Sequence, residues 1–405
     1  MAQNLLSDWQ SLGLQTSFRF SGLTSIGTFS DFGDIDINNR GVTAYSASAS
    51  GTANNAITGI YTTRNGRRTE TIATLDSLNT LFQDVTSGSN ISNISYTLGT
   101  EIDINNQGDV VFEGRLTFTQ TESTGNQNIQ IERLFIKDGN QFRTLAEERV
   151  SNRPTSPGSG GIVIPDSQTR TIDIQDFSIN DSDQLVYRFQ ESQGQGISLA
   201  LVRDGQRILT ETSTAGSGTA TFQTPTIIND GSVYYSKSGG NFQDEDNIFR
   251  IASGNTTATP LISIDNDVSG FSVNEQGTVV FSGRTLDNSP GRFEITTGTF
   301  QIGSNGLTQI NSTDALFVDV NRRDSVVTQS LSGSQAIVFE RSNVEQTVIE
   351  SGGTLNGLQV ASLEFGALND RNQLVFSTTF ADGTTGIFRA DLRRSFSSSV
   401  TLSRD

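Results

Sequence analysis

Two stretches of the chain place side-chain oxygen atoms at every second residue. Asp34, Asp36 and Asn38 form the first set, and Glu101 and Asp103 begin the second. In a β-strand such residues share one face, so we expect Asp34, Asp36 and Asp103 to line a common surface. Oxygen ligands suit calcium, and paired carboxylates can perform glycoside chemistry without histidine. The alternative is that these groups are polar wall residues or turn caps.

A further acidic run, from Asp244 to Asn247, lies in a predicted turn. The stretch at Asp34 does not follow an EF-hand loop, because a loop starting at Asp34 would have Asn39 at position 6 and Tyr45 at position 12. Calcium is the one cofactor that we keep as a candidate, and otherwise we expect none. Its candidate ligands are Asp34, Asp36, Asp103, Asp244 and Asp246. For the acidic run, a solvated loop is the alternative.

Histidine and cysteine are both absent from the 405 residues. Their absence excludes Ser-His-Asp and Cys-His catalysis, disulfides and the usual ligands of zinc. A metal would have to bind to oxygen ligands, which favours Ca²⁺ or Mg²⁺. We therefore predict a protein that is not an enzyme. A carbohydrate-active enzyme that uses Asp34, Asp36 and Asp103 remains an alternative.

The formal net charge is −17, and the isoelectric point is near 4.4. Nucleic acids and anionic membrane surfaces both require clustered Lys and Arg, which an acidic chain disfavours. No stretch approaches the roughly 20 apolar residues of a membrane helix. We predict no nucleic-acid partner and no membrane insertion.

One short phrase recurs along the chain, and its clearest copy runs from Phe271 to Phe281, FSVNEQGTVVF. Alternating apolar residues lead into Asn274-Glu275-Gln276-Gly277, and a second apolar run follows. Asn bonds to its own backbone and Gly tolerates positive φ, so the phrase predicts a β-hairpin.

Seven copies of this phrase fill most of the chain. Their turn Asn residues are at 38, 105, 180, 229, 274, 321 and 369, at spacings of 67, 75, 49, 45, 47 and 48. The fourth copy, from Asn229 to Tyr234, is shorter than the others. Asn-Gly or Asp-Gly predicts a second hairpin at Asn65, Asp138 and Asp204. The sequence thus predicts an all-β protein, a single β-propeller of seven blades with four antiparallel strands each. A linear β-solenoid is the structural alternative.

The N-x-x-G-x-x-x-F repeat resembles the tandem-repeat proteins of bacteria, cyanobacteria among them, that are named for this motif and for their choice of C-terminal anchor. The resemblance extends from about Asp34 to Phe388. It implies an exported protein. The chain departs from the pattern after Arg393, where no apolar anchor helix follows, so surface attachment by that route is not expected.

The segments outside the repeats divide the chain into three parts: 1–33, an N-terminal extension; 34–392, the propeller; and 393–405, a tail. Thr16 to Phe20 alternates like a strand and should complete the last blade, with Ser399 to Ser403 as the other candidate. A spare terminal strand could instead pair with a neighbouring molecule. For such contacts the candidate residues are Trp9, Phe18 and Phe20.

The predicted function is a structural or interaction role. We expect a rigid building block or adhesion module of a bacterial surface or extracellular assembly, which associates with itself through its termini or with other surface proteins. The alternatives are a calcium-dependent glycan-binding module and the carboxylate enzyme. Residues 1–9 resemble no signal peptide, so export would be leaderless or the leader is missing, and a cytoplasmic location is the other alternative.

Overall fold

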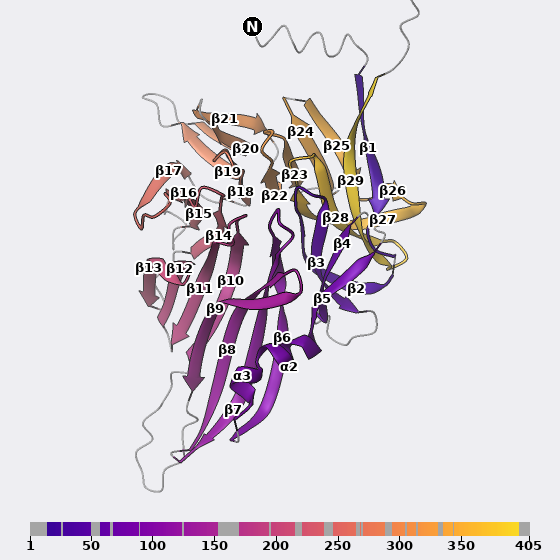
Figure 1. Cartoon of the computed structure of the whole chain (residues 1–405). Coiled ribbons are helices and arrows are strands. Elements are labelled where there is room, and N and C mark those ends of the chain that lie inside the picture. The colour runs from indigo at the N-terminus through magenta and orange to yellow at the C-terminus, as the bar shows by residue number, and fades with distance from the viewer. Residues whose placement is uncertain are drawn as a thin grey trace, which may run out of the picture.

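The computed structural model describes most of the propeller (Figure 1). Its described residues are 14–25, 27–49, 57–64, 68–88, 90–123, 125–152, 170–193, 196–214, 221–238, 246–264, 268, 270–287, 294–303, 306–312, 315–330, 335–342 and 344–396. Their strands form seven antiparallel sheets arranged as a β-propeller. The predicted seven blades of four strands are confirmed, and the sheets are numbered here as blades 1 to 7 in chain order.

Each blade is a meander in which sequential strands are neighbours. Blade 1 contains β2 (Phe29–Ile37), β3 (Val42–Ala49), β4 (Gly59–Arg64) and β5 (Thr69–Thr74). Blade 2 contains β6 (Ile91–Ile104), β7 (Val110–Glu122), β8 (Gly125–Asp138) and β9 (Gln141–Asn152). Blade 3 contains β10 (Arg170–Ile179), β11 (Leu185–Gln193), β12 (Gly196–Arg203) and β13 (Gln206–Thr214). Blade 4 contains β14 (Thr221–Ile227), β15 (Val233–Ser238), β16 (Asp246–Ile251) and β17 (Ala258–Ile264).

The remaining three blades continue the same order. Blade 5 contains β18 (Gly270–Val273), β19 (Val279–Asp287), β20 (Glu294–Gly303) and β21 (Gly306–Asn311). Blade 6 contains β22 (Ala315–Val320), β23 (Val326–Ser330), β24 (Ala336–Arg341) and β25 (Val344–Glu350). Blade 7 contains β26 (Thr354–Leu355), β27 (Leu358–Leu368), β28 (Gln373–Phe380), β29 (Thr385–Phe396) and, paired with β29, β1 (Leu14–Gly22).

The strand β1 lies at the outer edge of blade 7. It pairs with β29 from Leu14 opposite Phe396 to Gly22 opposite Phe388, so the two ends of the chain meet in one sheet. Phe18 packs edge-on against Phe339 of blade 6, with ring centroids 5.7 Å apart. The N-terminal strand thus takes the closing place expected of it, while Ser399 to Ser403 lies outside the described residues.

The recurring turn connects the first and second strands of each blade. In blade 1, Gly41 N–H donates to the Asn38 carbonyl oxygen at 2.9 Å, and Asn38 N–H donates to the Val42 carbonyl oxygen at 3.0 Å. Blade 4 repeats this geometry with Ile228, not Asn229, as the first turn residue: Gly231 N–H donates to Ile228 at 2.8 Å.

The sequence alignment of the fourth copy was therefore wrong by one residue. With Ile228 as its first turn residue, the spacings on either side become 48 and 46, and the aromatic residue seven positions later is the buried Tyr235. In the sequence, Asn229 resembles the turn Asn of the other copies because it is the residue directly after Ile228. Blade 4 therefore has the same turn length as its neighbours.

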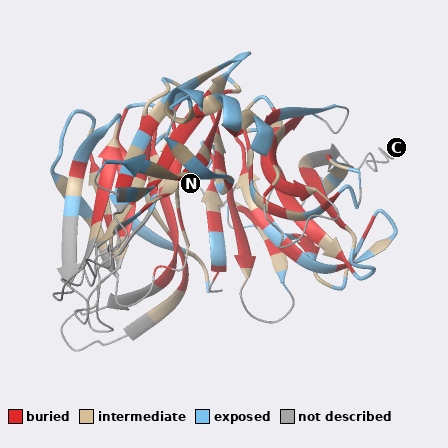
Figure 2. Cartoon of the chain, turned by 90° about the horizontal axis from the view of Figure 1, so that it is seen from below, coloured by how far each residue is buried: buried red, intermediate tan, exposed pale blue. Residues whose placement is uncertain are grey.

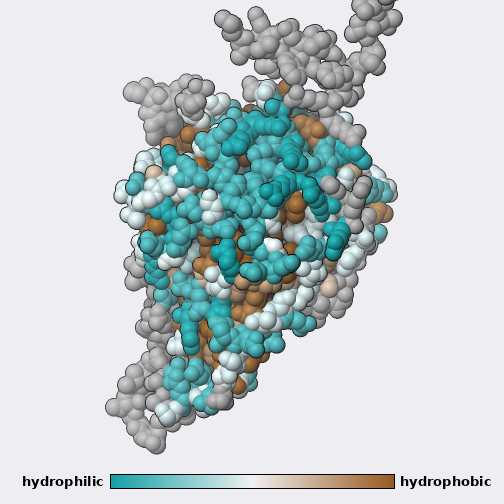
Figure 3. All heavy atoms as spheres, viewed as in Figure 1, coloured by the Kyte–Doolittle hydropathy of each residue, from teal (hydrophilic) through white to brown (hydrophobic). Residues whose placement is uncertain are grey.

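The apolar core lies between blades. Separate clusters join neighbouring blades, such as Ile104 of blade 2 packed in one cluster with Ala44 of blade 1, and Val327 of blade 6 with Leu374 of blade 7. Buried segments follow the strands around the molecule, and exposed residues gather in the loops (Figure 2). The face seen in Figure 3 is mostly hydrophilic. Each blade is covered by a neighbouring blade on both faces, which explains why its strands contain continuous apolar runs.

Blade 2 is larger than the others and projects beyond them (Figure 1). Two helices, α2 (Leu75–Leu81) and α3 (Gln83–Thr86), precede it and pack on its sheet, and Phe82 between them is fully buried against Phe135, with centroids 5.5 Å apart. Thr74 and Ser77 form a capping box at the start of α2. The sequence predicts an all-β protein, and these two helices are an addition to that prediction.

Candidate functional site

The seven first strands surround a central channel with two different ends. At one end, the turns of all seven blades and the residues before them surround a narrow cavity of about 220 Å³. At the other end the channel widens into a pocket of about 620 Å³. We call these the turn end and the mouth.

The turn end contains a ring of hydrogen bonds, called here the inner turn ring. The side-chain amide of the first turn residue donates to the backbone carbonyl oxygen of its counterpart in the next blade. The bonds run from Asn38 to Asn105 (3.0 Å), Asn180 to Ile228 (3.1 Å), Asn274 to Asn321 (2.9 Å), Asn321 to Asn369 (3.0 Å) and Asn369 to Asn38 (2.9 Å). The same amide also accepts from its own turn, since Asn321 Oδ1 accepts from Arg323 N–H and Ser325 N–H. The repeated Asn thus stabilises both the hairpin and the contact between blades.

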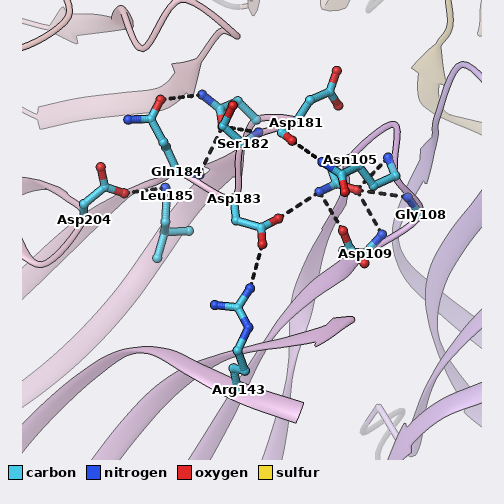
Figure 4. Close-up of polar contacts among 12 residues, drawn as sticks. Asn105, Gly108, Asp109, Arg143, Asp181, Ser182, Asp183, Gln184, Leu185 and Asp204 are labelled. Atoms are coloured by element: carbon cyan, nitrogen blue, oxygen red, sulfur yellow. Dashed lines mark hydrogen bonds and ion pairs between the residues drawn. The ribbon is translucent and has the colours of Figure 1, made fainter. Parts of the chain in front are cut away.

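Two blades depart from this pattern. In blade 2 the Asn105 amide donates instead to Asp183 Oδ1 of blade 3 at 3.2 Å, and Asp183 forms an ion pair with Arg143 at 2.6 Å (Figure 4). In blade 4 Ile228 has no amide to donate, and it packs in an apolar cluster with Phe271 of blade 5.

A second ring, the outer turn ring, is formed by the next residue of each turn. Its backbone N–H donates to a side-chain oxygen of the counterpart in the following blade. The bonds run from Asn39 to Asn106 (2.8 Å), Asn106 to Asp181 (2.8 Å), Asp181 to Asn229 (2.8 Å), Asn229 to Glu275 (2.8 Å), Arg322 to Asp370 (2.7 Å) and Asp370 to Asn39 (2.7 Å). The step from blade 5 to blade 6 lacks this bond, because Arg322 has no acceptor to offer.

Inside the channel, carboxylates connect the blades in the same manner. Asp36 Oδ2 accepts from Ile104 N–H at 3.1 Å, Asp103 Oδ2 from Ile179 N–H at 2.8 Å, and Asp319 Oδ2 from Leu368 N–H at 2.7 Å. Asp34 Oδ2 accepts from Ile102 N–H at 3.3 Å. These oxygen atoms satisfy backbone groups on the edge of the next inner strand, which is a structural role.

Asp36 and Asp103 are hydrogen-bonded to each other through their carboxyl groups. Burial raises the pKa of both, and the charge of Asp103 raises the pKa of Asp36 further. Two carboxyl groups in contact hold a proton between them. Glycosidase pairs are about 5–10 Å apart, so this pair is too close for that chemistry.

Besides the Asp36–Asp103 pair, four carboxylates from four blades line the mouth. Asp34 (β2), Glu101 (β6) and Asp176 (β10) occupy the same place in successive repeats, four residues before the first turn residue, and Glu364 (β27) adds a fourth. Register shifts occur at this level in β2, β6 and β10, and Asp176 has φ +43°. These bulges redirect the inner strands where the channel widens.

The mouth has an excess of negative charge. None of the described residues that line it is Lys or Arg, and Arg188 on the neighbouring strand β11 forms an ion pair with Asp176 at 2.9 Å. Burial raises the pKa of Glu101 to about 8, and the charges of Asp176 and Asp34 add to the effect. The Asp34 side chain is exposed to water, but that water lies inside the mouth and protein surrounds it. The resulting desolvation, together with the charge of Asp36, raises the pKa of Asp34 to about 7.

Aromatic residues line the mouth together with these carboxylates. Phe317 of β22 is 41% exposed and is the only large exposed aromatic side chain among the described residues. The buried Phe177 and Phe365 support the same pocket. An exposed ring beside several carboxylates suits a ligand that is cationic and has an apolar stem.

A second cavity of about 790 Å³ lies beside α3 and blade 2. Its charged side chains are already paired: Arg133 binds Asp84 at 2.7 Å and Glu147 at 2.6 Å, and it lies over the ring of Phe82 at 5.0 Å. This mutual pairing leaves little free polar chemistry, so the mouth is the stronger candidate.

Some of the predicted site residues lie in the described part of the chain, and others lie outside it. Asp34, Asp36 and Asp103 meet in the channel as expected. Asp246 begins β16, its side chain lies outside the described part, and Asp244 and Trp9 lie outside it altogether. Among the described residues no group of three or more acidic side chains is arranged to hold a metal ion, so calcium stays a prediction.

Phe18 and Phe20, predicted as interaction residues, are half-buried on β1 within the propeller. Phe20 packs edge-on against Phe376 at 6.3 Å between centroids. A strand exchanged between two chains would make the same contacts, so the self-association prediction stays open to experiment.

Sequence reasoning did not propose Asp176, Glu364 or Phe317. Aligning the seven repeats would have revealed Asp176, because it is four residues before Asn180 as Asp34 is before Asn38. Phe317 is four residues before Asn321 in blade 6, and an apolar residue within a strand is normally interpreted as part of the core.

Solved structures with similar architecture share little sequence with this chain. An acylaminoacyl peptidase of Pyrococcus horikoshii has 8% identity and a TM-score of 0.47, and the match covers 91% of this chain and 54% of that one. The polysaccharide lyase Uly1 has 10% identity and a TM-score of 0.45, with 88% and 89% covered. A gluconolactonase of Xanthomonas campestris has 11% identity and a TM-score of 0.34, with 76% and 93% covered. Likeness at this level carries no inference about activity.

Three further findings bear on identity. No helix in the described ranges has the length and apolar character needed to cross a membrane. A search of curated proteins found no match. Residues 21–267 match a family of unknown function, DUF7453, which covers more than half of the chain. The relation to the choice-of-anchor proteins stays a prediction, whereas the chain belongs to the DUF7453 family.

Proposed function

We propose that the protein is a non-enzymatic interaction protein, a rigid propeller whose mouth binds a basic side chain of a partner protein. One observation carries the proposal: a pocket of about 620 Å³ with four carboxylates besides the Asp36–Asp103 pair, an exposed Phe317, and neither Lys nor Arg among its described lining residues. The extracellular or cell-surface setting expected from the sequence is part of the proposal, and the acidic composition supports it.

Electrostatics favour a cationic group in this pocket. Glu101 and Asp34 repel each other, and a guanidinium or ammonium group placed between them would relieve this repulsion. The ring of Phe317 would contact the aliphatic stem or the cation itself. A lysine or arginine side chain offers both features in one group.

A binding experiment tests the proposal. The affinity of a short arginine-containing peptide is measured by calorimetry at pH 8, and the same peptide with citrulline serves as the neutral ligand. The double variant Glu101→Gln/Glu364→Gln should lose affinity about tenfold or more, because two carboxylates no longer face the cation.

Glu122→Gln/Glu350→Gln is the matched control, since both side chains are exposed on β7 and β25, away from the mouth. Its affinity should equal that of the unmodified protein. Equal binding of arginine and citrulline peptides, or equal losses in the two variants, would refute the proposal.

A carboxylate-based enzyme is the second candidate, favoured by one observation. Asp34 and Glu101, with pKa values raised to about 7 and about 8, would exchange protons near neutral pH in a concave site. Release of sugar ends or unsaturated products from polysaccharides, abolished in Glu101→Gln, would establish that activity. Calcium-dependent glycan binding would instead raise the melting temperature only when calcium is added.

A further inference from the structure

The turn end carries a group of arginines that the proposed function does not use. The second and third turn residues of blades 6, 7 and 1 include Arg322, Arg323, Arg371 and Arg40, which we call the arginine arc. The same places in blades 2 to 5 hold no Lys or Arg. Four cations on three consecutive blades are unusual in a chain of net charge −17.

The arginine arc is only partly balanced by the protein, because the charge of Arg322 favours the Glu275 carboxylate of blade 5 without a direct ion pair. All four side chains are exposed, and none has an ion pair within the part of the chain that the structure describes. Only the Arg40 guanidinium has a hydrogen bond, to the Gln107 carbonyl oxygen at 3.1 Å. By contrast, Arg133 and Arg188 in the blades bind carboxylates at 2.6–2.9 Å.

The backbone below the arginine arc is held by both turn rings. Asn321 donates to Asn369 and Asn369 to Asn38, at 3.0 and 2.9 Å, and the outer ring is continuous through Asp370. The guanidinium groups therefore extend from anchor points of fixed spacing. Because the backbone is already ordered, ligand binding has to order only the arginine side chains.

Carboxylates elsewhere on this surface limit where an anion can lie. Asp370 sits within the arc, but its two oxygen atoms accept from Arg322 N–H at 2.7 Å and from the Asn39 amide at 2.6 Å. The acidic turn residues Asp181 and Asp230 lie on blades 3 and 4, in the other part of the ring. Glu275 of blade 5 interacts with Arg322 at the end of the arc, and Asp324 follows Arg323 within it. The four arginines outnumber the two turn carboxylates of blades 6, 7 and 1, so an anionic ligand is favoured there.

The chemistry of the turn tips favours a polymer over a folded protein. The second and third turn residues of the seven blades are polar at all fourteen places, whereas protein interfaces have an apolar core. None of these places holds an aromatic residue on which a nucleic-acid base could stack. A chain of repeating anionic groups can span three blades, which a small anion cannot.

We propose that the arginine arc binds a linear acidic polysaccharide, with carboxylate or sulfate groups paired to Arg322, Arg323, Arg371 and Arg40. The binding would be dominated by charge, since the turn residues of the arc offer no apolar surface. It would therefore weaken steeply with salt. This site is independent of the mouth, at the opposite end of the channel.

Binding of polygalacturonate to the full chain tests this inference, with dextran as the neutral polymer. Affinity is measured at 50 and 300 mM NaCl. The variant Arg323→Gln/Arg371→Gln should bind about tenfold more weakly at the lower salt concentration and show a smaller dependence on salt. Arg323→Lys/Arg371→Lys should retain most of the affinity, because it keeps both charges.

The matched control is Arg149→Gln/Arg207→Gln, which removes two exposed arginines of blades 2 and 3. It should bind like the unmodified protein. Dextran sulfate in place of polygalacturonate tells whether sulfate is preferred to carboxylate. Equal losses in both double variants, equal binding of dextran, or tighter binding of a single-stranded oligonucleotide would each overturn the inference.

Discussion

The two ends of the channel are built from the same seven strands, but their polar groups are paired at one end and repel each other at the other end. At the turn end, backbone donors and side-chain acceptors satisfy one another, as Asn321 does with four partners. At the mouth, Glu101 and Asp34 lie close enough to repel each other. The difference indicates that the turn end stabilises the ring, and that the mouth retains unfavourable charge which a ligand can relieve.

The largest effect is expected from the inner turn ring. Asn321→Ala removes an amide that is 3% exposed and leaves its backbone and side-chain partners unsatisfied. The free energy of unfolding should fall by about 3 kcal/mol. Urea denaturation of the variant measures this value.

The exposed Asn229 of the outer turn ring provides the comparison. Asn229→Ala should cost about 1 kcal/mol, because water can replace its hydrogen bonds. If both substitutions cost the same, the inner ring does not have the special role given to it here.

A smaller effect is expected from the glycine of the turn. Gly108 has φ +97°, and an added Cβ would meet nothing within 4 Å, so only backbone strain opposes a side chain. Gly108→Ala should destabilise the protein by about 1 kcal/mol. Gly303→Ala is the control, because that site is equally open and has no positive φ. Equal losses at both sites would show that strain in the turn is unimportant.

The mouth predicts a pH dependence of the opposite sense to ordinary acid denaturation. Folding raises the pKa of Glu101 from 4.5 to about 8 and that of Asp34 from 3.8 to about 7. At a pH between the unfolded and the folded pKa of each group, the folded state therefore binds more protons than the unfolded chain. Stability must then fall as the pH rises through this window. The melting temperature should be higher at pH 5.5 than at pH 8.5, and an equal or lower value would contradict the account.

The fold was more predictable from sequence than the site. Asn274 to Gly277 encodes a hairpin locally, so repeated copies reveal the blades. Ile228 misled the alignment, because only the folded turn shows that an apolar residue occupies the place of Asn. The mouth combines residues of separate blades, so the partnership of Glu364 with Glu101 has no local signal.

The sequence before blade 2 contains a helical pattern that an interpretation based only on the repeats overlooks. Leu78, Phe82 and Val85 recur at helical spacing after the Thr74 cap, which favours an amphipathic helix. Their order between two blades made a connecting loop the simpler expectation. Helices as short as α2 and α3 are not stable by themselves, and the packing of Phe82 on blade 2 stabilises them.

The most direct test of the contrast is the effect of Glu101→Gln on the free energy of unfolding at pH 8.5, measured beside Asn321→Ala. The neutral amide removes a charge that burial and its acidic neighbours oppose, so Glu101→Gln should stabilise the protein slightly at pH 8.5 and have less effect at pH 5.5. Asn321→Ala should destabilise it at both pH values. If Glu101→Gln also destabilises the protein at pH 8.5, Glu101 contributes to stability, and the division between a stabilising turn end and a strained mouth is wrong.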